Sequence, residues 1–317
     1  MKIIILSSGT GRRLLPLTAN TPKSLIDLGN GKTLLETQIE NIAKSGVIDE
    51  IVVVIGYCAD QVEAKIKKYR REGLRIKTVY NPFYEVSNNL MTLWMAKHEM
   101  NEDFMITNGD NIFESEVFSE LATKNKNGIF LTTSLRDSYG EDDMKVIIED
   151  GLIEKVSKQI QGDKAGAESV GLTLISGEKY REIFKDNLEE LAREPEYVQK
   201  FWLEVFNRMI SKGVRVAPFE IDGKRLWVEV DFHGDLSDVI RGLMEKKLSK
   251  ISGEQAHHIR KEINALNNPR LKEEGVMNII ESVPRTNEDL ATIVGKEVLS
   301  DAESQQVLSI IERYLTH

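Results

Sequence analysis

The sequence predicts an α/β protein with a mixed, mainly parallel sheet flanked by helices and a small all-helical C-terminal domain. Strand and helix patterns alternate over about the first 110 residues, which is typical of a parallel sheet covered on both faces. A hairpin pattern then introduces antiparallel strands, and from about Ser249 onward no strand pattern is apparent. The expected domains are residues 1–248 and residues 253–317.

The N-terminal elements are predicted from apolar runs and their end signals. Lys2–Leu6 is a β-branched run that stops at Ser7-Ser8-Gly9, as expected of a strand buried in a parallel sheet. Leu34–Lys44 has helical spacing of its apolar residues and ends before Gly46. The alternation continues through the predicted strands and helices Ile51–Ile55, Asp60–Arg71, Arg75–Tyr80, Asn88–Met100 and Phe104–Thr107.

The later elements begin with a hairpin around Asp150-Gly151, because both turn positions tolerate positive φ. The predicted strands are Met144–Ile148, Leu152–Val156, Ser169–Ile175, Val214–Phe219 and Leu226–Val230. The predicted helices are Lys179–Ala192, Val198–Ser211, Gly234–Lys247, Gly253–Leu266, Pro269–Ser282, Thr286–Val294 and Ser300–Leu315. Capping boxes at Thr286 and Ser300 support the last two helix starts.

Composition and charge exclude several classes of protein. Of the 317 residues, 41% are hydrophobic and 29% charged, as is usual for a globular protein. The net charge of −9 argues against a general nucleic-acid surface and leaves a local basic pocket open. The single cysteine, Cys58, rules out an internal disulfide and favours a cytoplasmic location. No apolar run reaches the roughly 20 residues that span a bilayer.

The strongest local pattern follows the first predicted strand. A loop of small residues, whose backbone N–H groups can approach an oxyanion closely, is formed by Ser7, Ser8, Gly9, Thr10 and Gly11. Arg12 adds a planar guanidinium suited to triphosphate oxygens, and Lys23 adds a point charge. Walker and dinucleotide loops are excluded, because no Gly-Lys-Ser/Thr follows and the third glycine is missing. Small-residue loops also follow strands without binding phosphate, so the glycines alone leave both interpretations open.

Two acidic segments follow later strands. Asn108-Gly109-Asp110 comes at the carboxyl end of a predicted strand, where α/β sheets bind ligands. Glu229-Val230-Asp231 ends another strand pattern. All three residues of Asn108-Gly109-Asp110 also favour turns, so this segment by itself equally fits a turn without a ligand.

Together these segments resemble the signature of the nucleotidyltransferase superfamily that activates sugar phosphates and alcohol phosphates. The likeness covers about residues 1–247 and includes Gly-x-Gly-x-Arg, a Pro-Lys pair about ten residues on, and the two acidic segments. Ser7-Ser8 stands where the family usually has Ala-Ala or Ala-Gly, which keeps the residues small. The resemblance implies a Rossmann-like nucleotidyltransferase sheet and an enzyme that joins a nucleoside triphosphate to a phosphorylated substrate and releases pyrophosphate.

The resemblance also implies residue roles. The loop from Ser7 to Gly11 would contact the base and phosphates of the nucleotide. Arg12 would neutralise the departing phosphates, and Lys23 would hold the α-phosphate and the attacking phosphate. Asp110 and Asp231 would hold Mg²⁺, which prefers hard oxygen ligands. A phosphate oxygen is already ionised at neutral pH, so catalysis needs positioning and charge neutralisation rather than a nucleophilic side chain or general base.

The segment from Asn81 to Asn89 resembles LicC-like phosphocholine cytidylyltransferases and related enzymes for phosphonates. Its residues are Asn81-Pro82-Phe83-Tyr84-Glu85-Val86-Ser87-Asn88-Asn89. The likeness favours CTP over dTTP or UTP, with Ser87 and Asn88 at the nucleotide and Asn89 at the acceptor. Ser87-Asn88 also fits a helix N-cap. The two interpretations are compatible, because exposed amides at a helix N-terminus bind anions.

Residues implied at the acceptor end lie further along the chain. Lys145 and Glu168 are in segments that also resemble this group, although a solvated strand residue and a strand cap are the alternatives. Trp202 and Glu204 form an aromatic and acidic pair suited to an ammonium group. The apolar spacing around Trp202, with Phe206 on the same face, is more typical of a core position.

The expected function is transfer of CMP from CTP to phosphocholine, phosphoethanolamine, 2-aminoethylphosphonate or a polyol phosphate, with Mg²⁺ as cofactor. One alternative is a sugar-1-phosphate nucleotidyltransferase using UTP or dTTP, and another is a catalytically inactive nucleotide-binding scaffold. The scaffold has no need of Arg12, Lys23, Asp110 and Asp231 together. The expected partners are therefore small molecules, with no nucleic acid at the catalytic domain and no membrane span.

The C-terminal helices carry a separate, short resemblance. Residues from about 269 to 316 resemble the small HRDC-like helical domain of an archaeal RNA polymerase subunit. The alternative, which we prefer, is a helical extension that packs on the catalytic domain or on the second subunit of a homodimer.

Overall fold

The computed structural model describes residues 1–28, 31–124, 127–136, 138–222, 225–231, 253–266, 268–272, 275–276, 279, 284, 286–295 and 298–315. The chain divides into two compact units, Met1–Leu236 and Ser237–His317. The expected division between residues 248 and 253 stays a prediction, because residues 232–252 lie outside the described ranges. The expected helix Gly234–Lys247 lies there as well.

Nine described strands of the first unit form one mixed sheet, whose main path has the order β10-β6-β9-β4-β1-β2-β3. β1 pairs in parallel with β2 and β4, and β9 pairs antiparallel with β4 and β6. The strands on this path are β1 (Lys2–Ser7), β2 (Glu50–Ile55), β3 (Ile76–Tyr80), β4 (Phe104–Asn108), β6 (Gly128–Ser134), β9 (Ala167–Ser176) and β10 (Ala217–Glu220). This arrangement confirms the expected mixed, Rossmann-like sheet.

The predicted hairpin is also confirmed. β7 (Lys145–Glu149) and β8 (Leu152–Ser157) are antiparallel, and β7 joins the sheet through β9. Asp150 and Gly151 connect them with φ of 49° and 75°, the positive values that the turn requires. A separate two-stranded sheet pairs β5 (Asn111–Phe113) with β11 (Trp227–Glu229).

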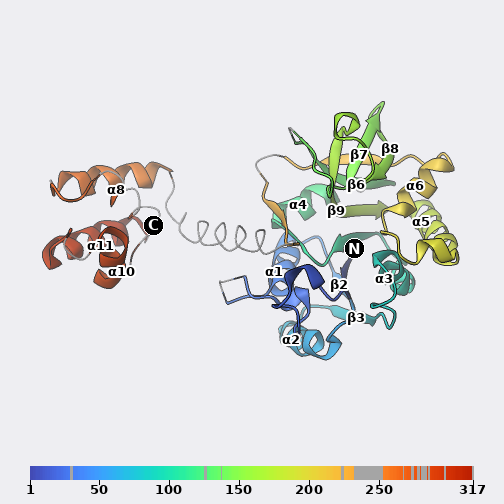
Figure 1. Ribbon diagram of the computed structural model, residues 1–317, viewed down its shortest axis with the longest axis horizontal. Helices are drawn as coiled ribbons and strands as arrows, with labels where there is room; N and C mark the ends of the chain where they lie inside the picture. The colour runs from blue at the N-terminus through green and yellow to red at the C-terminus, as the bar shows by residue number, and fades with distance from the viewer. Residues whose placement is uncertain are drawn as a thin grey trace. The chain divides into compact units, whose positions relative to one another are not determined.

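Helices cover both faces of the main sheet (Figure 1). Ile3 and Ile5 of β1 face one helical layer, and Ile4 and Leu6 face the other, because successive strand residues point to opposite faces. The first layer contains α1 (Leu34–Ser45), α2 (Ala59–Arg71) and α4 (Ser115–Ala122). The second contains α3 (Asn89–Met95), α5 (Glu178–Ala192) and α6 (Glu204–Ser211). Burial on both faces explains why the β1 sequence is a continuous apolar run.

Local end signals act as predicted in α1. Thr33 forms a capping box with Glu36, and the helix ends at Gly46, whose φ of 70° is the left-handed conformation that glycine adopts without strain. The predicted helix Asn88–Met100 is shorter than expected, since α3 ends at Met95 and a short 3₁₀ turn, Lys97–Glu99, follows.

The predicted helix Val198–Ser211 is wrong in its first half. Pro195–Tyr197 is a 3₁₀ turn, and α6 begins only at Glu204. The intervening carbonyls of Val198 and Lys200 accept hydrogen bonds from the start of α3 at 2.9 and 3.3 Å, so a tertiary contact replaces the helical pattern. The structure also contains β5, α4 and β6 between residues 110 and 144, where the sequence patterns predicted no element.

The described part of the second unit contains the helices α8 (Gly253–Ala265), α10 (Asn287–Val294) and α11 (Asp301–Leu315). An apolar core joins them through Ile263, Leu290 and Val307. Capping boxes at Thr286 and Ser300 form as predicted. The expected helix Pro269–Ser282 falls largely on residues outside the described ranges.

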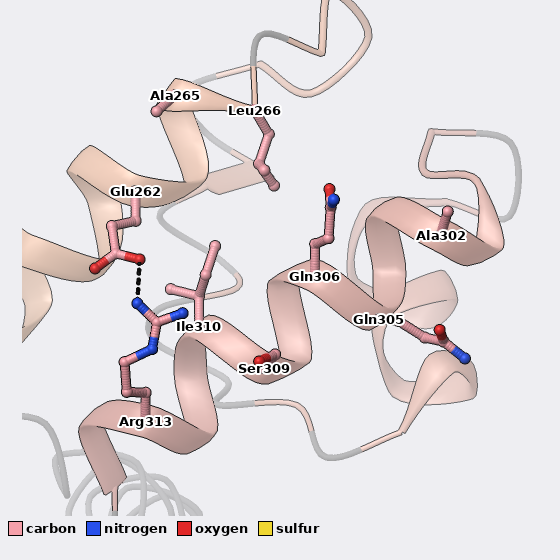
Figure 2. Close-up of a pocket in the computed structure, with 9 residues that line it drawn as sticks. All are labelled: Glu262, Ala265, Leu266, Ala302, Gln305, Gln306, Ser309, Ile310 and Arg313. Carbon is pink, nitrogen blue, oxygen red and sulfur yellow. Dashed lines mark hydrogen bonds and ion pairs between the residues drawn. The ribbon is translucent and has the colours of Figure 1, made fainter.

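A pocket of about 610 Å³ lies between α8 and α11. Figure 2 shows Glu262 of α8 and Arg313 of α11 pointing toward each other, with a hydrogen bond of 2.9 Å between them. Across all described residues of the chain, the helices are too short or too polar to cross a bilayer.

Candidate active site

The polar residues of the candidate site meet at one edge of the main sheet. β1 and β4 are parallel neighbours, so the loops after Ser7 and Asn108 leave the sheet at the same edge. β9 runs antiparallel to β4, so its first residues, including Glu168, start at that edge. The sheet topology therefore brings together segments that are more than 100 residues apart in sequence.

A charge cluster joins three of the expected residues. Lys23 Nζ donates to Asp110 Oδ2 at 2.8 Å and to Asp231 Oδ1 at 2.6 Å. Arg13 Nη1 donates to Asp231 Oδ2 at 2.7 Å. Burial opposes the charge of Lys23, whose side chain is 15% exposed, but the two carboxylates outweigh it and raise its pKa. The ammonium is therefore charged and held between the aspartates.

A third carboxylate, Glu229, belongs to this cluster. Oxygens of Asp110, Glu229 and Asp231 lie within 4.8 Å of one another. Glu229 is exposed when the whole residue is considered, but its carboxyl group is desolvated. This desolvation, followed by the charges of Asp110 and Asp231, raises the pKa of Glu229 to about 8. The sequence pattern contained Glu229 but gave it no role. Its position two residues before Asp231 was the signal that could have assigned it to the carboxylate cluster, because alternate residues of a strand point to the same face.

The cluster fits a hard divalent cation. Asp110 Oδ1 is buried and has no hydrogen-bond partner among the described residues, which is costly for a carboxylate oxygen unless a cation satisfies it. Three carboxylates provide the oxygen ligands that Mg²⁺ prefers. The Lys23 ammonium forms ion pairs with two of them but offsets only one negative charge. The residues that can hold a metal here are Asp110, Glu229 and Asp231.

The small-residue loop packs directly against Lys23. Gly11 has a φ of 64°, and a Cβ on it would lie 2.8 Å from the Cβ of Lys23. Thr18 Oγ1 donates to the Gly11 carbonyl at 2.8 Å, which holds the loop in this conformation. Arg12 begins a 3₁₀ turn and has an exposed side chain, so its proposed contact with phosphates stays a prediction.

The start of the loop is fixed by a buried polar network. Ser8 Oγ and Thr92 Oγ1 of α3 are 2.8 Å apart, and Asn81 Nδ2 donates to Thr92 Oγ1 at 3.1 Å. Ser7 and Ser8 are therefore buried, whereas Gly9 is exposed and no atom would lie within 4 Å of a Cβ built on it. The middle of the loop, with Thr10, is the part that solvent and a ligand can reach.

The residues expected at the nucleotide side of α3 have structural partners. Ser87 Oγ donates to the Phe83 carbonyl at 2.7 Å, and Asn88 is the N-cap of α3. Asn89 Oδ1 accepts a hydrogen bond from the Trp202 backbone N–H at 2.9 Å. The N-cap interpretation of Asn88 is confirmed, and ligand contacts of all three remain predictions.

Trp202 occupies the core position that its apolar spacing predicted, so its ring does not form the expected ammonium site with Glu204. Contact of Glu204 with a ligand stays a prediction. The Trp202 side chain is 0% exposed, its ring packs edge-on against Phe206, and its indole N–H donates to Asn108 Oδ1 at 2.9 Å. Glu204 accepts a hydrogen bond from Asn207 of its own helix. In this structure Trp202 is a core residue that positions Asn108, and its ring presents no face to a ligand.

Lys145 and Glu168 are adjacent in the sheet, where they pair across β7 and β9. Lys145 is 2% exposed, and its ammonium donates to the carbonyl of Gly140 at 2.7 Å, so it is neither a solvated strand residue nor directed at a ligand here. Burial raises the pKa of Glu168 to about 7 against the opposing charge of Arg136. Contact of either residue with an acceptor stays a prediction.

Asn108 occupies a space left by a glycine. Gly171 of β9 has a φ of 72°, and a Cβ on it would lie 2.5 Å from Asn108 Nδ2. Gln38 Nε2 also donates to the carbonyl of Asn108 at 3.0 Å. Asn108 is thus held by three separate elements, and it fixes the turn that carries Asp110.

Gly171→Ala should destabilise the first unit by more than Gly213→Ala, measured as free energy of unfolding in urea. Both glycines have positive φ (72° and 78°), so both replacements carry the backbone strain of about 1 kcal/mol. Only at Gly171 does the added methyl also collide with Asn108, since nothing lies within 4 Å at Gly213. Equal losses in the two variants would contradict this account of Asn108.

Comparison with known proteins agrees with this geometry. The Nucleotidyl transferase family matches residues 2–139. A choline-phosphate cytidylyltransferase from Streptococcus pneumoniae is 30% identical over 234 residues, which are 73% of this chain and 93% of the relative. A CTP:phosphoglutamine cytidylyltransferase from Campylobacter jejuni is 28% identical over 255 residues, which are 74% of this chain and 98% of the relative.

A solved structure shares the fold of the first unit. CTP:phosphocholine cytidylyltransferase from Streptococcus pneumoniae (LicC) aligns with a TM-score of 0.60 at 23% identity, over 76% of this chain and 98% of that chain. The resemblance of the C-terminal helices to a polymerase subunit gains no support from these matches. Because one relative reaches 30% identity with nearly its whole length covered, the chain belongs to the nucleotidyltransferase family.

Proposed function

We propose that this protein is a cytidylyltransferase that transfers CMP from CTP to a small phospho-alcohol or phosphonate and releases pyrophosphate, with Mg²⁺ as its cofactor. The observation that carries the proposal is the Lys23 ammonium held between Asp110 and Asp231 beside the small-residue loop. Two relatives named as cytidylyltransferases, one for choline phosphate and one for phosphoglutamine, support the choice of nucleotide and of a phosphorylated acceptor.

The sheet order divides the site into two halves. β4, whose end leads to Asp110, lies between β1 and β9. On the β1 side are the Ser7–Gly11 loop and the start of α3, which suit the nucleotide. On the β9 side are Glu168 and the β6–β7 connection, which suit the acceptor. Asp110 would then lie where the α-phosphate of CTP meets the acceptor phosphate.

The reaction requires an acceptor oxygen to form a bond to the α-phosphorus of CTP while the bond from that phosphorus to the pyrophosphate oxygen breaks. Anions must therefore meet, and cations lower the barrier by neutralising them. Lys23 would leave the aspartates and bind the α-phosphate and acceptor oxygens, while Arg12 binds the departing phosphates. Mg²⁺, held by Asp110, Asp231 and Glu229, would supply further positive charge at the α-phosphate.

One charge supports a choice of acceptor class. Glu168 is buried on the β9 side, where a carboxylate favours an acceptor that carries an ammonium group. Phosphocholine, phosphoethanolamine and 2-aminoethylphosphonate have that group, and polyol phosphates lack it. We therefore place an amine-bearing acceptor first among the expected substrates.

CTP should be preferred over UTP, dTTP, ATP and GTP by at least about tenfold in kcat/KM, which corresponds to about 1.4 kcal/mol of transition-state stabilisation. The measurement is pyrophosphate release with each triphosphate across a panel of phosphorylated acceptors. Efficient use of UTP or dTTP with a sugar 1-phosphate would instead assign the chain to the sugar-activating branch of its family.

Lys23→Met should lower kcat by about 100-fold or more and change the KM for CTP by only a few-fold. The reason is that the meeting phosphates are most crowded in the transition state, where the ammonium is needed most. Lys185→Met, which removes an ammonium from α5, is the control and should keep wild-type kinetics. A raised KM for CTP with unchanged kcat would remove Lys23 from the catalytic residues.

Asp110→Asn and Asp231→Asn should each abolish most activity and weaken binding of Mn²⁺, used as a paramagnetic substitute for Mg²⁺. Each variant keeps the shape of the side chain and loses the charge that a hard cation requires. Chelation of the wild-type protein should have the same effect on turnover, reversed by added Mg²⁺. Full activity of either variant at ordinary Mg²⁺ concentration would show that the cluster is only structural.

A further inference from the structure

Beside the carboxylate cluster, a guanidinium lies over an aromatic ring. The central carbon of the Arg136 guanidinium is 5.4 Å from the centre of the Trp227 ring. Trp227 lies on β11, and its ring is stacked on Phe113 of β5 at 6.5 Å with 20° between the planes. The face of a tryptophan attracts cations through the quadrupole of the ring. One face of the Trp227 ring is therefore covered by the Arg136 guanidinium, and the ring is held in place by stacking on Phe113.

The same guanidinium is paired with a buried carboxylate. Arg136 Nε is 2.5 Å from Glu168 Oε2, and the two side chains are 45% and 6% exposed. Glu168 Oε2 has no aligned hydrogen-bond partner among the described residues, so charge rather than a shaped contact holds the pair together. Glu168 is fixed in the sheet, and the exposed Arg136 side chain is the member that can be exchanged.

A second arginine shows what a fixed pair of this kind looks like. The Arg208 guanidinium lies 5.5 Å from the Tyr197 ring and donates two hydrogen bonds to Glu194, at 2.9 and 3.0 Å. Two parallel bonds of this kind lock a planar guanidinium in place. Arg136 also has one aromatic and one acidic neighbour, but it lacks the two parallel hydrogen bonds. Its side chain is about twice as exposed as that of Arg208.

The aromatic and acidic face adjoins the charge cluster on the acceptor side. Trp227 and Glu229 are two residues apart on β11, so their side chains lie on the same face of that strand. Glu168 pairs with Ser134 at the end of β6, two residues before Arg136. β6 and β9 lie beyond β4 from the small-residue loop, in the half of the site assigned above to the acceptor. Trp227, on the separate strand β11, meets this half through its contact with Arg136.

We propose that the Trp227 face and the Glu168 carboxylate form the seat of the acceptor's ammonium group, and that Arg136 fills this seat until the acceptor displaces it. The inference rests on the proposed function and deepens it, because it names the class of acceptor and a residue that sets the affinity. Binding of the ammonium moves the Arg136 guanidinium into solvent, so Arg136 competes with the acceptor. The seat is thereby assigned to Trp227 in place of the buried Trp202.

The test is Arg136→Gln, which removes the charge and keeps a polar side chain. It should lower the KM for phosphocholine about threefold or more, the size expected when a competing cation leaves an aromatic and acidic site. Neohexyl phosphate is the isostere of phosphocholine in which an uncharged tert-butyl group replaces the trimethylammonium group. The KM for neohexyl phosphate and the KM for CTP should each stay within about twofold of the wild-type value. Arg208→Gln is the matched control and should leave all three values unchanged.

Two kinetic results would overturn the proposal. A raised KM for both phosphocholine and neohexyl phosphate would show that Arg136 binds the acceptor phosphate or an acidic group of the acceptor. Unchanged values for both acceptors in Arg136→Gln would show that the guanidinium does not occupy the seat at all.

A binding experiment separates this inference from the proposed function. Choline, which lacks a phosphate, should bind more tightly to Arg136→Gln than to the wild-type protein, and more weakly to Glu168→Gln, as measured by calorimetry without CTP. If choline binds in this order while no acceptor supports pyrophosphate release, the seat stands and the transferase proposal fails. If choline binds neither the wild-type protein nor Arg136→Gln, the seat is rejected, whatever the enzyme assay shows.

Discussion

The contact of one ammonium with two aspartates organises the edge of the sheet. Lys23 comes from the loop after β1, Asp110 from the turn after β4 and Asp231 from the segment after β11, so a single charge ties together segments 87 and 208 residues away. Three carboxylates within 4.8 Å would repel one another without it. The same arrangement holds a cation at the place where, in the proposed reaction, the phosphates would meet. The charge of the Lys23 ammonium therefore both stabilises the site and provides a cation for a phosphate.

Two glycines make that contact possible, because side chains pack closely against their backbones. Gly11 lies against the stem of Lys23, and Gly171 leaves room for the Asn108 amide, in both cases at distances that a Cβ would not allow. The conformations also require positive φ, which only glycine adopts without strain. Glycines here shape the floor of the site, whereas the exposed Gly9 belongs to its open surface.

Basic side chains on the proposed acceptor side already have partners within the protein. Lys145 donates to loop carbonyls between β6 and β7, and it is buried too deeply to meet a ligand in this structure. Arg136 neutralises Glu168, which would otherwise be an uncompensated carboxylate among buried strands. Lys145 is thus a structural cation, whereas Arg136 is the cation that an acceptor would displace. The difference lies in exposure and in the alignment of their bonds rather than in charge.

The sequence by itself determined most strands and helices outside residues 110–144, because continuous apolar runs, capping boxes and positive-φ turns act over a few residues. It gave no signal for β5, α4 and β6, which lie within that stretch. Strand ends and the family likeness also placed Lys23, Asp110 and Asp231 in one site. Only the tertiary structure decided that Trp202 turns into the core and that Arg136 covers Trp227 beside Glu168. Helical spacing cannot tell a core aromatic from a ligand-facing one. Which surface a side chain meets depends on packing between segments far apart in the chain, and local pattern carries no information about that packing.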